Sequence, residues 1–145
     1  MTVVYKAKAM NFGGREGFVK VLDSGLEFVM AGAAHPGTNP EQLFAAAYAG
    51  SFGSAVMQVI QRQELSVETF RVTIEIALMQ DDKEGQKLAA DISLSVTGIN
   101  RTKAIQLLRD AYEICPYSRA TNGNINVKFT PIMVNESSSK DELPG

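Results

Sequence analysis

The sequence predicts an α+β fold, with a mostly antiparallel sheet around a long buried central helix. Residues 67–80 and 88–96 alternate apolar and polar side chains across a charged turn, a pattern typical of a long antiparallel hairpin. Residues 42–61 carry no charge, as expected of a helix buried on nearly every face. The expected order is strands, helix, two strands, helix and strand, which favours the α+β class.

The N-terminal part of the chain predicts three strands. Alternation over residues 2–8 indicates a first strand, and the glycine-containing residues 11–17 indicate a turn. Residues 18–22 and 26–30 flank Asp23-Ser24-Gly25, and this arrangement predicts a hairpin.

Two adjacent signals predict the start of the central helix. Thr38 and Glu41 have the spacing of a capping box, and Asn39 followed by Pro40 is an equally good N-cap and first-turn pair. We expect the helix to end near Gln63.

Asn100 is expected to cap a second helix, which Pro116 breaks or kinks near its end. Residues 125–129 then form a last strand. The length of 145 residues predicts a single domain over residues 1–134, and the polar residues 135–145 predict a flexible tail.

Composition excludes several classes of protein. The net charge of -2 lacks the basic footprint of a nucleic-acid binder, and a lone cysteine cannot form an intrachain disulfide. The N-terminus lacks the continuous apolar stretch of a secretory signal, so we expect a cytoplasmic protein. The uncharged helix contains polar residues and has no flanking basic cluster, which argues against a membrane span.

A chain this short has few elements with which to surround an uncharged helix, so packing against a second subunit is expected. Small residues along the helix allow close approach of a neighbour: Ala46, Ala47, Ala49, Gly50, Ser51 and Gly53. They indicate either tight helix packing, which spacing alone favours, or space for a ligand at the buried centre.

Three motifs resemble the Ohr/OsmC family of organic hydroperoxide reductases. Residues 13–17 (GGREG) are similar to its glycine-rich turn with the active-site arginine, and residues 38–49 (TNPEQLFAAAYA) to the opening of its central helix. Residues 115–125 (CPYSRATNGNI) resemble the segment with its second cysteine. Tyr117 and residues 123–125 favour the organic hydroperoxide resistance (Ohr) branch.

The resemblance implies an OsmC-like fold and an intertwined homodimer with active sites at the subunit interface. It implies reduction of organic hydroperoxides, including fatty-acid hydroperoxides, to alcohols. In the family, one cysteine attacks the peroxide and becomes a sulfenic acid, the second condenses with it to a disulfide, and a dithiol such as a lipoylated protein reduces that bond. No metal, haem, flavin or other cofactor is implied.

Four residues match the catalytic positions of the family. Arg15 matches the arginine that stabilises the thiolate, Glu41 its carboxylate partner, and Cys115 the second cysteine, whereas Ser51 stands where the first cysteine belongs. Without the resemblance, Arg15 would be a loop charge and Glu41 a capping carboxylate. Positions 41 and 51 are roughly 15 Å apart along a helix. We therefore expect the Arg15–Glu41 pair to act on Ser51 of the other subunit, or the Arg15 side chain to extend from the pair to Ser51.

Serine cannot form a sulfenic acid or a disulfide, and its hydroxyl is a weak nucleophile without a base. We therefore expect this chain to be inactive or impaired as a peroxidase. Ser51 is either natural or an engineered replacement of cysteine, and the sequence leaves both open.

A lone cysteine on an apolar helix face is usually a core residue. The Cys-Pro-Tyr-Ser context of Cys115 favours a functional role for this cysteine instead.

Two rival functions remain. Residues 49–53 (AGSFG) approach the G-x-S-x-G motif of serine hydrolases, but that motif needs a strand-to-helix turn, and the only histidine is His35 in a loop. A non-catalytic binder of lipid or hydroperoxide would keep the apolar pocket and lose the peroxidase activity.

Overall fold

The computed structural model describes residues 1–31 and 36–133. The contacts of the chain form two units, residues 1–43 and 44–145, which are described separately below. His35 and the expected tail over residues 135–145 lie outside the described residues, and a single domain over residues 1–134 stays a prediction.

The first unit contains a small antiparallel sheet in the order β1-β2-β3. Its strands are β1 (Ala9–Phe12), β2 (Phe18–Val21) and β3 (Glu27–Val29). The turn at residues 23–25 joins β2 to β3, so the hairpin predicted there is confirmed.

The strand expected over residues 2–8 is not formed, and β1 begins only at Ala9. Val3 and Tyr5, on the apolar side of that alternation, are 72% and 77% exposed. A strand needs a neighbour for its backbone hydrogen bonds, and alternation in the sequence does not supply one.

Helix α1 (Pro40–Gln63) begins and ends where the sequence predicts. Asn39 is the N-cap, because its Oδ1 accepts a hydrogen bond from the Gln42 amide at 2.8 Å. Thr38 instead donates its hydroxyl hydrogen to Gln42 Oε1, so the first of the two predicted caps is wrong. Pro40 occupies the first helical position, where its missing amide hydrogen costs nothing.

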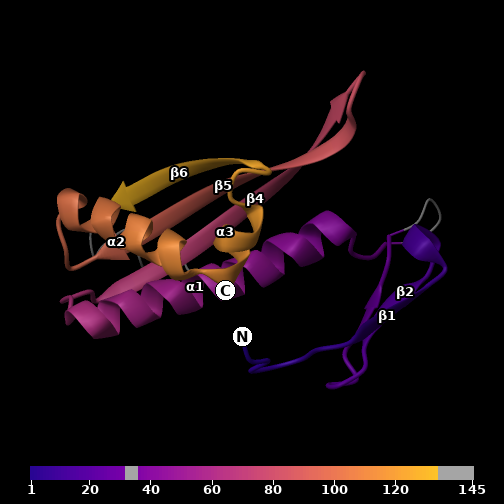
Figure 1. Ribbon diagram of the computed structural model, residues 1–145, viewed down its shortest axis with the longest axis horizontal. Coiled ribbons are helices and arrows are strands. Elements are labelled where there is room, and N and C mark those ends of the chain that lie inside the picture. Colours follow the sequence, from indigo (N-terminus) through magenta and orange to yellow (C-terminus); the bar gives the residue numbers. More distant parts are fainter. Residues whose placement is uncertain (32–35, 134–145) are drawn as a thin grey trace. The chain divides into compact units, whose positions relative to one another are not determined.

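The second unit is built on a three-stranded sheet in the order β4-β5-β6. β4 (Thr69–Asp81) and β5 (Gly85–Thr97) form the predicted antiparallel hairpin, whose far end extends beyond the helices (Figure 1). β6 (Asn126–Met133) pairs parallel to β5, so this sheet is mixed. The parallel pairing requires a crossover connection, which two helices provide.

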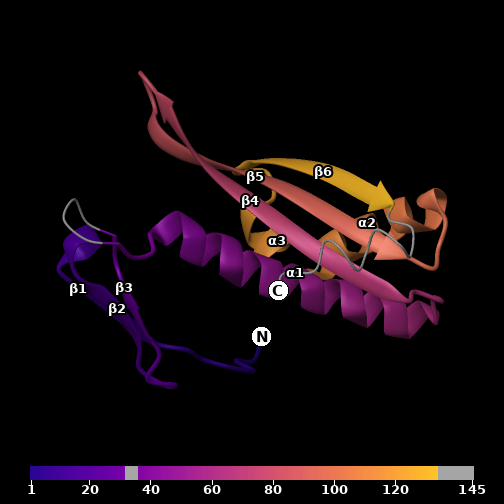
Figure 2. The same ribbon diagram turned by 180° about the vertical axis from the view of Figure 1, so that it is seen from behind.

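The crossover consists of α2 (Arg101–Ile114) and α3 (Pro116–Thr121). Asn100 Oδ1 accepts a hydrogen bond from the Lys103 amide at 2.9 Å, which confirms the predicted cap. Figures 1 and 2, taken from opposite sides, show α2 and α3 on one face of the sheet.

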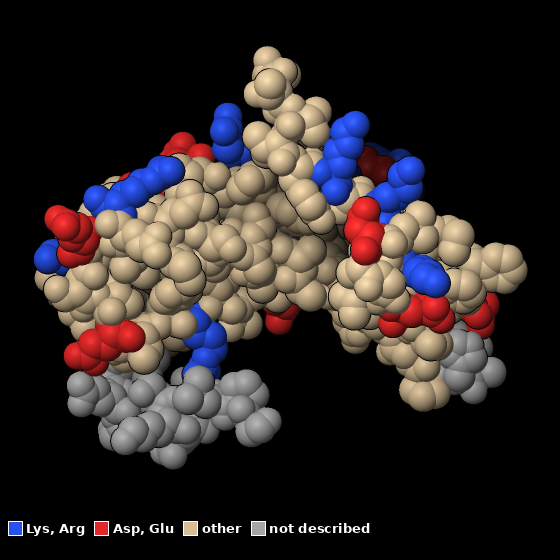
Figure 3. Space-filling model, turned by 90° about the horizontal axis from the view of Figure 1, so that it is seen from below, with Lys and Arg blue, Asp and Glu red and all other residues tan. Residues whose placement is uncertain are grey.

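The core of this unit lies between α1, α2 and the inner face of the sheet. Its fully buried large side chains are Tyr48, Phe52, Val56, Ile92, Leu94, Val96 and Leu107. The other side of α1 is exposed, and the surface over this helix carries no acidic or basic side chain along most of its length (Figure 3).

By length and composition α1 could cross a membrane, but the core helix of a soluble protein passes the same test. Within the described chain 28% of the most apolar 18-residue window of this helix is buried, and the buried residues of α1 are Tyr48, Phe52, Ala55, Val56 and Val59.

Candidate functional site

A bend in the chain at Cys115 positions its thiol. Pro116 disfavours helical geometry in the residue before it, and Cys115 accordingly adopts an extended conformation with φ -68° and ψ 121°. The Cys115 amide still donates to the Ala111 carbonyl, and the Cys115 carbonyl accepts from the Arg119 amide. The backbone amide and carbonyl of Cys115 are thereby satisfied, and the Cys115 residue is fully buried.

The thiol of Cys115 lies against Ser51 on α1. Ser51 Oγ and Cys115 Sγ are 3.4 Å apart, within hydrogen-bonding distance for sulfur. The family motifs predict that these two positions take part in one reaction, and the structure brings them into contact although they are 64 residues apart in sequence. Ser51 lies in mid-helix, so the strand-to-helix turn of a serine hydrolase is absent at this position.

A buried hydrogen-bond network supports the bend. Tyr48 Oη lies 2.9 Å from Ser118 Oγ and 3.4 Å from Thr121 Oγ1. Thr121 Oγ1 also donates to the carbonyl oxygens of Tyr117 and Ser118. Because Tyr48 and Ser118 are both fully buried, this network links α1 to α3 within the protein core.

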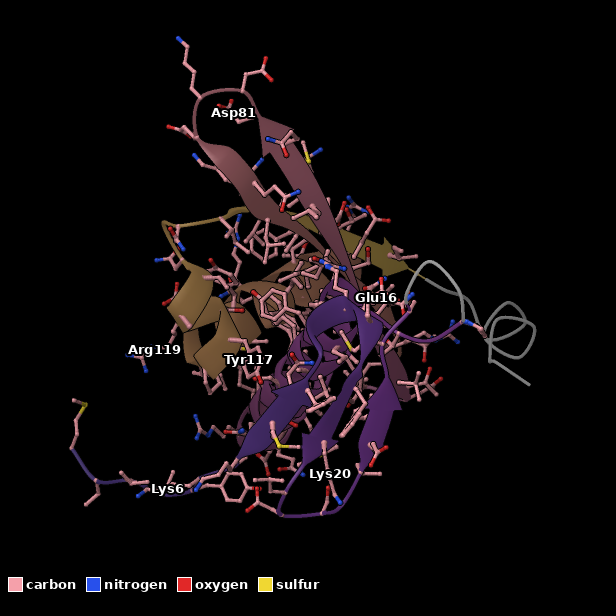
Figure 4. The ribbon with its side chains drawn as sticks, turned by 90° about the vertical axis from the view of Figure 1, so that its right-hand side faces the viewer. Lys6, Glu16, Lys20, Asp81, Tyr117 and Arg119 are labelled. Atoms are coloured by element: carbon pink, nitrogen blue, oxygen red, sulfur yellow. The ribbon has the colours of Figure 1, made fainter. Side chains whose placement is uncertain are left out.

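Three aromatic rings gather beside the contact between Ser51 and Cys115. Phe44, Tyr48 and Tyr117 have ring centroids 5.9 to 6.3 Å apart. Figure 4 labels Tyr117 on α3, together with Arg119, which is exposed. Phe44 and Tyr117 are half-buried and provide an apolar surface suited to the hydrocarbon part of a ligand, whereas Tyr48 is fully buried.

Arg15 belongs to a turn that a single asparagine holds in shape. Asn11 donates from Nδ2 to the carbonyls of Gly14 and Phe18, and its Oδ1 accepts from the Gly14 amide. Gly17 is required in this turn, because a Cβ there would lie 1.7 Å from the Phe12 carbonyl oxygen.

Arg15 and Glu41 form the ion pair that the resemblance implies. Arg15 Nη2 lies 2.9 Å from Glu41 Oε1, which is a single hydrogen bond instead of the bidentate geometry that a carboxylate can provide. The hydrogen bond from Arg15 and a backbone hydrogen bond at Glu41 together hold the pKa of Glu41 below its ordinary value of 4.5. The first turn of α1 also favours a negative charge at this position.

The sequence motifs included Tyr48 and Ser118 but assigned no role to either. The available signal was spacing, because Tyr48, Phe52 and Ala55 recur at helical intervals on one face of α1. A tyrosine on such a face needs a buried partner for its hydroxyl group, and nothing local identifies Ser118 as that partner. No cluster of three His, Cys, Asp or Glu side chains able to hold a metal occurs among residues 1–31 and 36–133.

Tyr48→Phe is expected to lower the free energy of unfolding by about 1–3 kcal/mol, because it leaves the buried Ser118 hydroxyl unsatisfied. Adding Ser118→Ala should recover part of this loss, since both polar groups are then removed. Urea denaturation of the two single variants and the double variant measures this coupling. Strictly additive changes would contradict a direct hydrogen bond.

Arg15→Gln is expected to raise the pKa of Glu41 toward its ordinary value. A carboxylate with a depressed folded-state pKa contributes stability above its unfolded pKa, and that contribution is lost as the pH falls through the folded pKa. The stability effect should be small, because the Arg15 side chain is 54% exposed. NMR titration of the Glu41 carboxyl carbon measures the pKa, with Arg62→Gln as the control that should leave it unchanged.

Comparisons with known proteins identify the family. Residues 32–130 match the model of the family described as OsmC-like protein. Over 132 residues, covering 87% of this chain and 96% of its relative, the sequence is 38% identical to the organic hydroperoxide resistance protein OhrB of Bacillus subtilis.

A structure from Legionella pneumophila, described as an organic hydroperoxide resistance protein OsmC, matches with a TM-score of 0.85 and 37% identity over 90% of this chain and 99% of that one. A relative from Staphylococcus saprophyticus, organic hydroperoxide resistance protein-like 1, is 37% identical over 140 residues, or 92% of this chain and 99% of its own length. The fold, the motifs and these similarities agree that the chain belongs to the OsmC-like family.

Proposed function

We propose that this chain has the architecture of a thiol peroxidase that detoxifies organic hydroperoxides, with its site centred on Ser51 and Cys115. The observation that carries the proposal is the 3.4 Å contact between Ser51 Oγ and Cys115 Sγ. Two-cysteine peroxidase chemistry needs its two reacting groups side by side, and these two positions meet that requirement. The names of the relatives, organic hydroperoxide resistance proteins, support the same role.

The proposed chemistry explains what each position does when a cysteine occupies position 51. Its thiol loses a proton, and the thiolate attacks the terminal peroxide oxygen. An S–O bond forms as the O–O bond breaks, and the departing alkoxide takes up a proton, in balance with the one that the thiol lost, and leaves as the alcohol. The thiol of Cys115 then condenses with the sulfenic acid to form a disulfide and release water. A dithiol such as a lipoylated protein restores both thiols by exchange and becomes a disulfide itself.

With serine at position 51 the first step cannot occur, because an alcohol oxygen is not oxidised by a hydroperoxide in this way. We therefore propose that the chain as it stands is inactive or impaired as a peroxidase. Serine is close to cysteine in size, and the contact between Ser51 and Cys115 supports retention of the site geometry.

The Arg15–Glu41 pair is proposed to stabilise the reacting group. A guanidinium beside a thiolate lowers its pKa, and a carboxylate holds that guanidinium in place. Glu41 and Ser51 lie on the same helix, roughly 15 Å apart along its axis. We propose that the pair of one subunit serves Ser51 of the other.

A homodimer is supported by the exposed face of α1. Gly50 is exposed, and a Cβ built on Gly50 or on Gly53 would meet no atom within 4 Å. Packing within the described chain therefore does not require glycine at either position. Met57, on the same helix, is 50% exposed. A second copy of the chain would cover these positions.

A cytoplasmic location stays a prediction.

The second candidate function is a non-catalytic binder of lipid or hydroperoxide. The observation that favours it is the half-buried pair of rings Phe44 and Tyr117, which offers an apolar surface near a serine that cannot perform the first redox step.

Ser51→Cys is expected to raise the rate of hydroperoxide consumption by about a hundredfold or more, because it restores an oxidisable nucleophile beside Cys115. The assay follows cumene hydroperoxide with dihydrolipoamide as reductant. Ser54→Cys is the matched control, since Ser54 is exposed one turn further along α1 and its hydroxyl donates to the Gly50 carbonyl.

The controls separate the two functions. Robust turnover by the unaltered chain would contradict the proposed mechanism, and an equal gain from Ser54→Cys would contradict the site. If neither Ser51→Cys nor the unaltered chain turns over but both bind fatty acids, the chain is a binder.

Sedimentation equilibrium is expected to give twice the chain mass of 15.7 kDa at micromolar concentration. Gly50→Leu should shift the equilibrium toward monomer, because the space around Gly50 would be needed by the second subunit. Thr102→Leu, at an exposed position of α2, is the control. A stable monomer of the unaltered chain would refute the proposed dimer.

A further inference from the structure

A groove of about 440 Å³ lies between α2 and the edge strand β6. The two elements run beside each other in Figure 1. Ile105 and Leu108 of α2 and Phe129 and Pro131 of β6 supply an apolar floor. Tyr112 closes one end, where its ring meets Phe129 edge to face at a centroid distance of 4.9 Å. The volume falls within the range of about 300–1,000 Å³ that is typical of small-molecule sites.

Two guanidinium groups line this floor. Arg101 and Arg109 both border the groove and lie roughly 12 Å apart along α2. Neither has a hydrogen-bond or ion-pair partner among the described residues. They are therefore available to a ligand, in contrast to Arg15, which is paired with Glu41.

The charge around the groove is unequal at its two ends. Arg101 is in the first turn of α2, which contains Lys103 and no acidic residue, and the N-terminus of a helix adds positive potential of its own. Glu113 borders the opposite end. An anion is therefore favoured near Arg101 and disfavoured near Glu113.

From this arrangement we infer a second ligand site, in which an amphipathic monocarboxylate lies along the groove. Its carboxylate contacts Arg101, and its hydrocarbon chain covers the floor toward Tyr112, past Arg109, which adds positive potential along the groove. Charge complementarity selects this class of ligand, because a cation would meet two guanidinium groups and a compact polyanion would leave the apolar floor uncovered. None of the groove residues belongs to the Ser51–Cys115 contact or to its aromatic cluster, so the inference does not depend on the proposed function.

Decanoate is a suitable probe, and isothermal titration calorimetry with the full chain measures its binding. Arg101→Gln combined with Arg109→Gln should weaken decanoate binding by about tenfold, because the charge-assisted contact with Arg101 and the positive potential of Arg109 are both lost. Arg62→Gln removes an exposed arginine near the end of α1 and should leave the affinity unchanged. Binding should weaken as ionic strength rises, since the guanidinium groups are exposed to solvent.

A variant of the floor tests the apolar half of the site. Ile105→Ser should weaken decanoate and decanol alike, whereas the double arginine variant should weaken decanoate alone. Circular dichroism melting shows whether each variant retains its fold, and ¹⁵N chemical-shift changes at residues 105–113 locate the bound ligand.

Three results would overturn the inference. The first is unchanged decanoate affinity in the double arginine variant. The second is loss of binding in Tyr117→Ala with no effect of the groove variants, which would place the ligand at the aromatic cluster. The third is a change of oligomeric state in the double arginine variant without decanoate binding to the unaltered chain, which would assign the groove to a second copy of the protein.

Discussion

The packing of α1 against β5 and α2 holds the Ser51–Cys115 contact in place. Tyr48, Phe52 and Val56 are fully buried on one face of α1, and each large apolar side chain buried in this way contributes roughly 1.5–3 kcal/mol. Ser51 is part of the same helix, and Cys115 terminates the helix that packs across from it. The Ser51–Cys115 contact is thus a consequence of core packing, with the Tyr48–Ser118 hydrogen bond connecting the two sides.

This arrangement separates the geometry of the site from its chemistry. The bend before Pro116, the buried network and the aromatic cluster involve no atom of the Ser51 side chain. A hydroxyl at position 51 therefore occupies a site whose surroundings are built by other residues. The hydroxyl at position 51 changes the reactivity of the site and leaves its geometry unaltered, because a serine oxygen cannot be oxidised in the way that a cysteine thiolate is.

Two kinds of exposed apolar surface follow from the same fold. The outer face of α1 has glycines at positions 50 and 53 and no charge, which suits close approach by another protein surface. The groove beside β6 is concave and carries guanidinium groups that have no partner among residues 1–31 and 36–133, which suits a small amphipathic ligand. The two surfaces differ in charge because α2 has charged residues on one side and apolar residues on the other, whereas the middle of α1 carries no charged residue.

By itself, the sequence determined helices α1 and α2 and the long hairpin, and its motifs predicted linked roles for Ser51 and Cys115. These features depend on local periodicity, on caps such as Asn100, and on motif order, all of which can be read along the chain. The tertiary structure alone decided the parallel pairing of β6, the late start of β1 at Ala9, the partner of Tyr48 and the groove at Arg101. The physical reason is that periodicity shows which face of an element is apolar, whereas only packing shows which distant element covers that face and which polar groups are left without a partner.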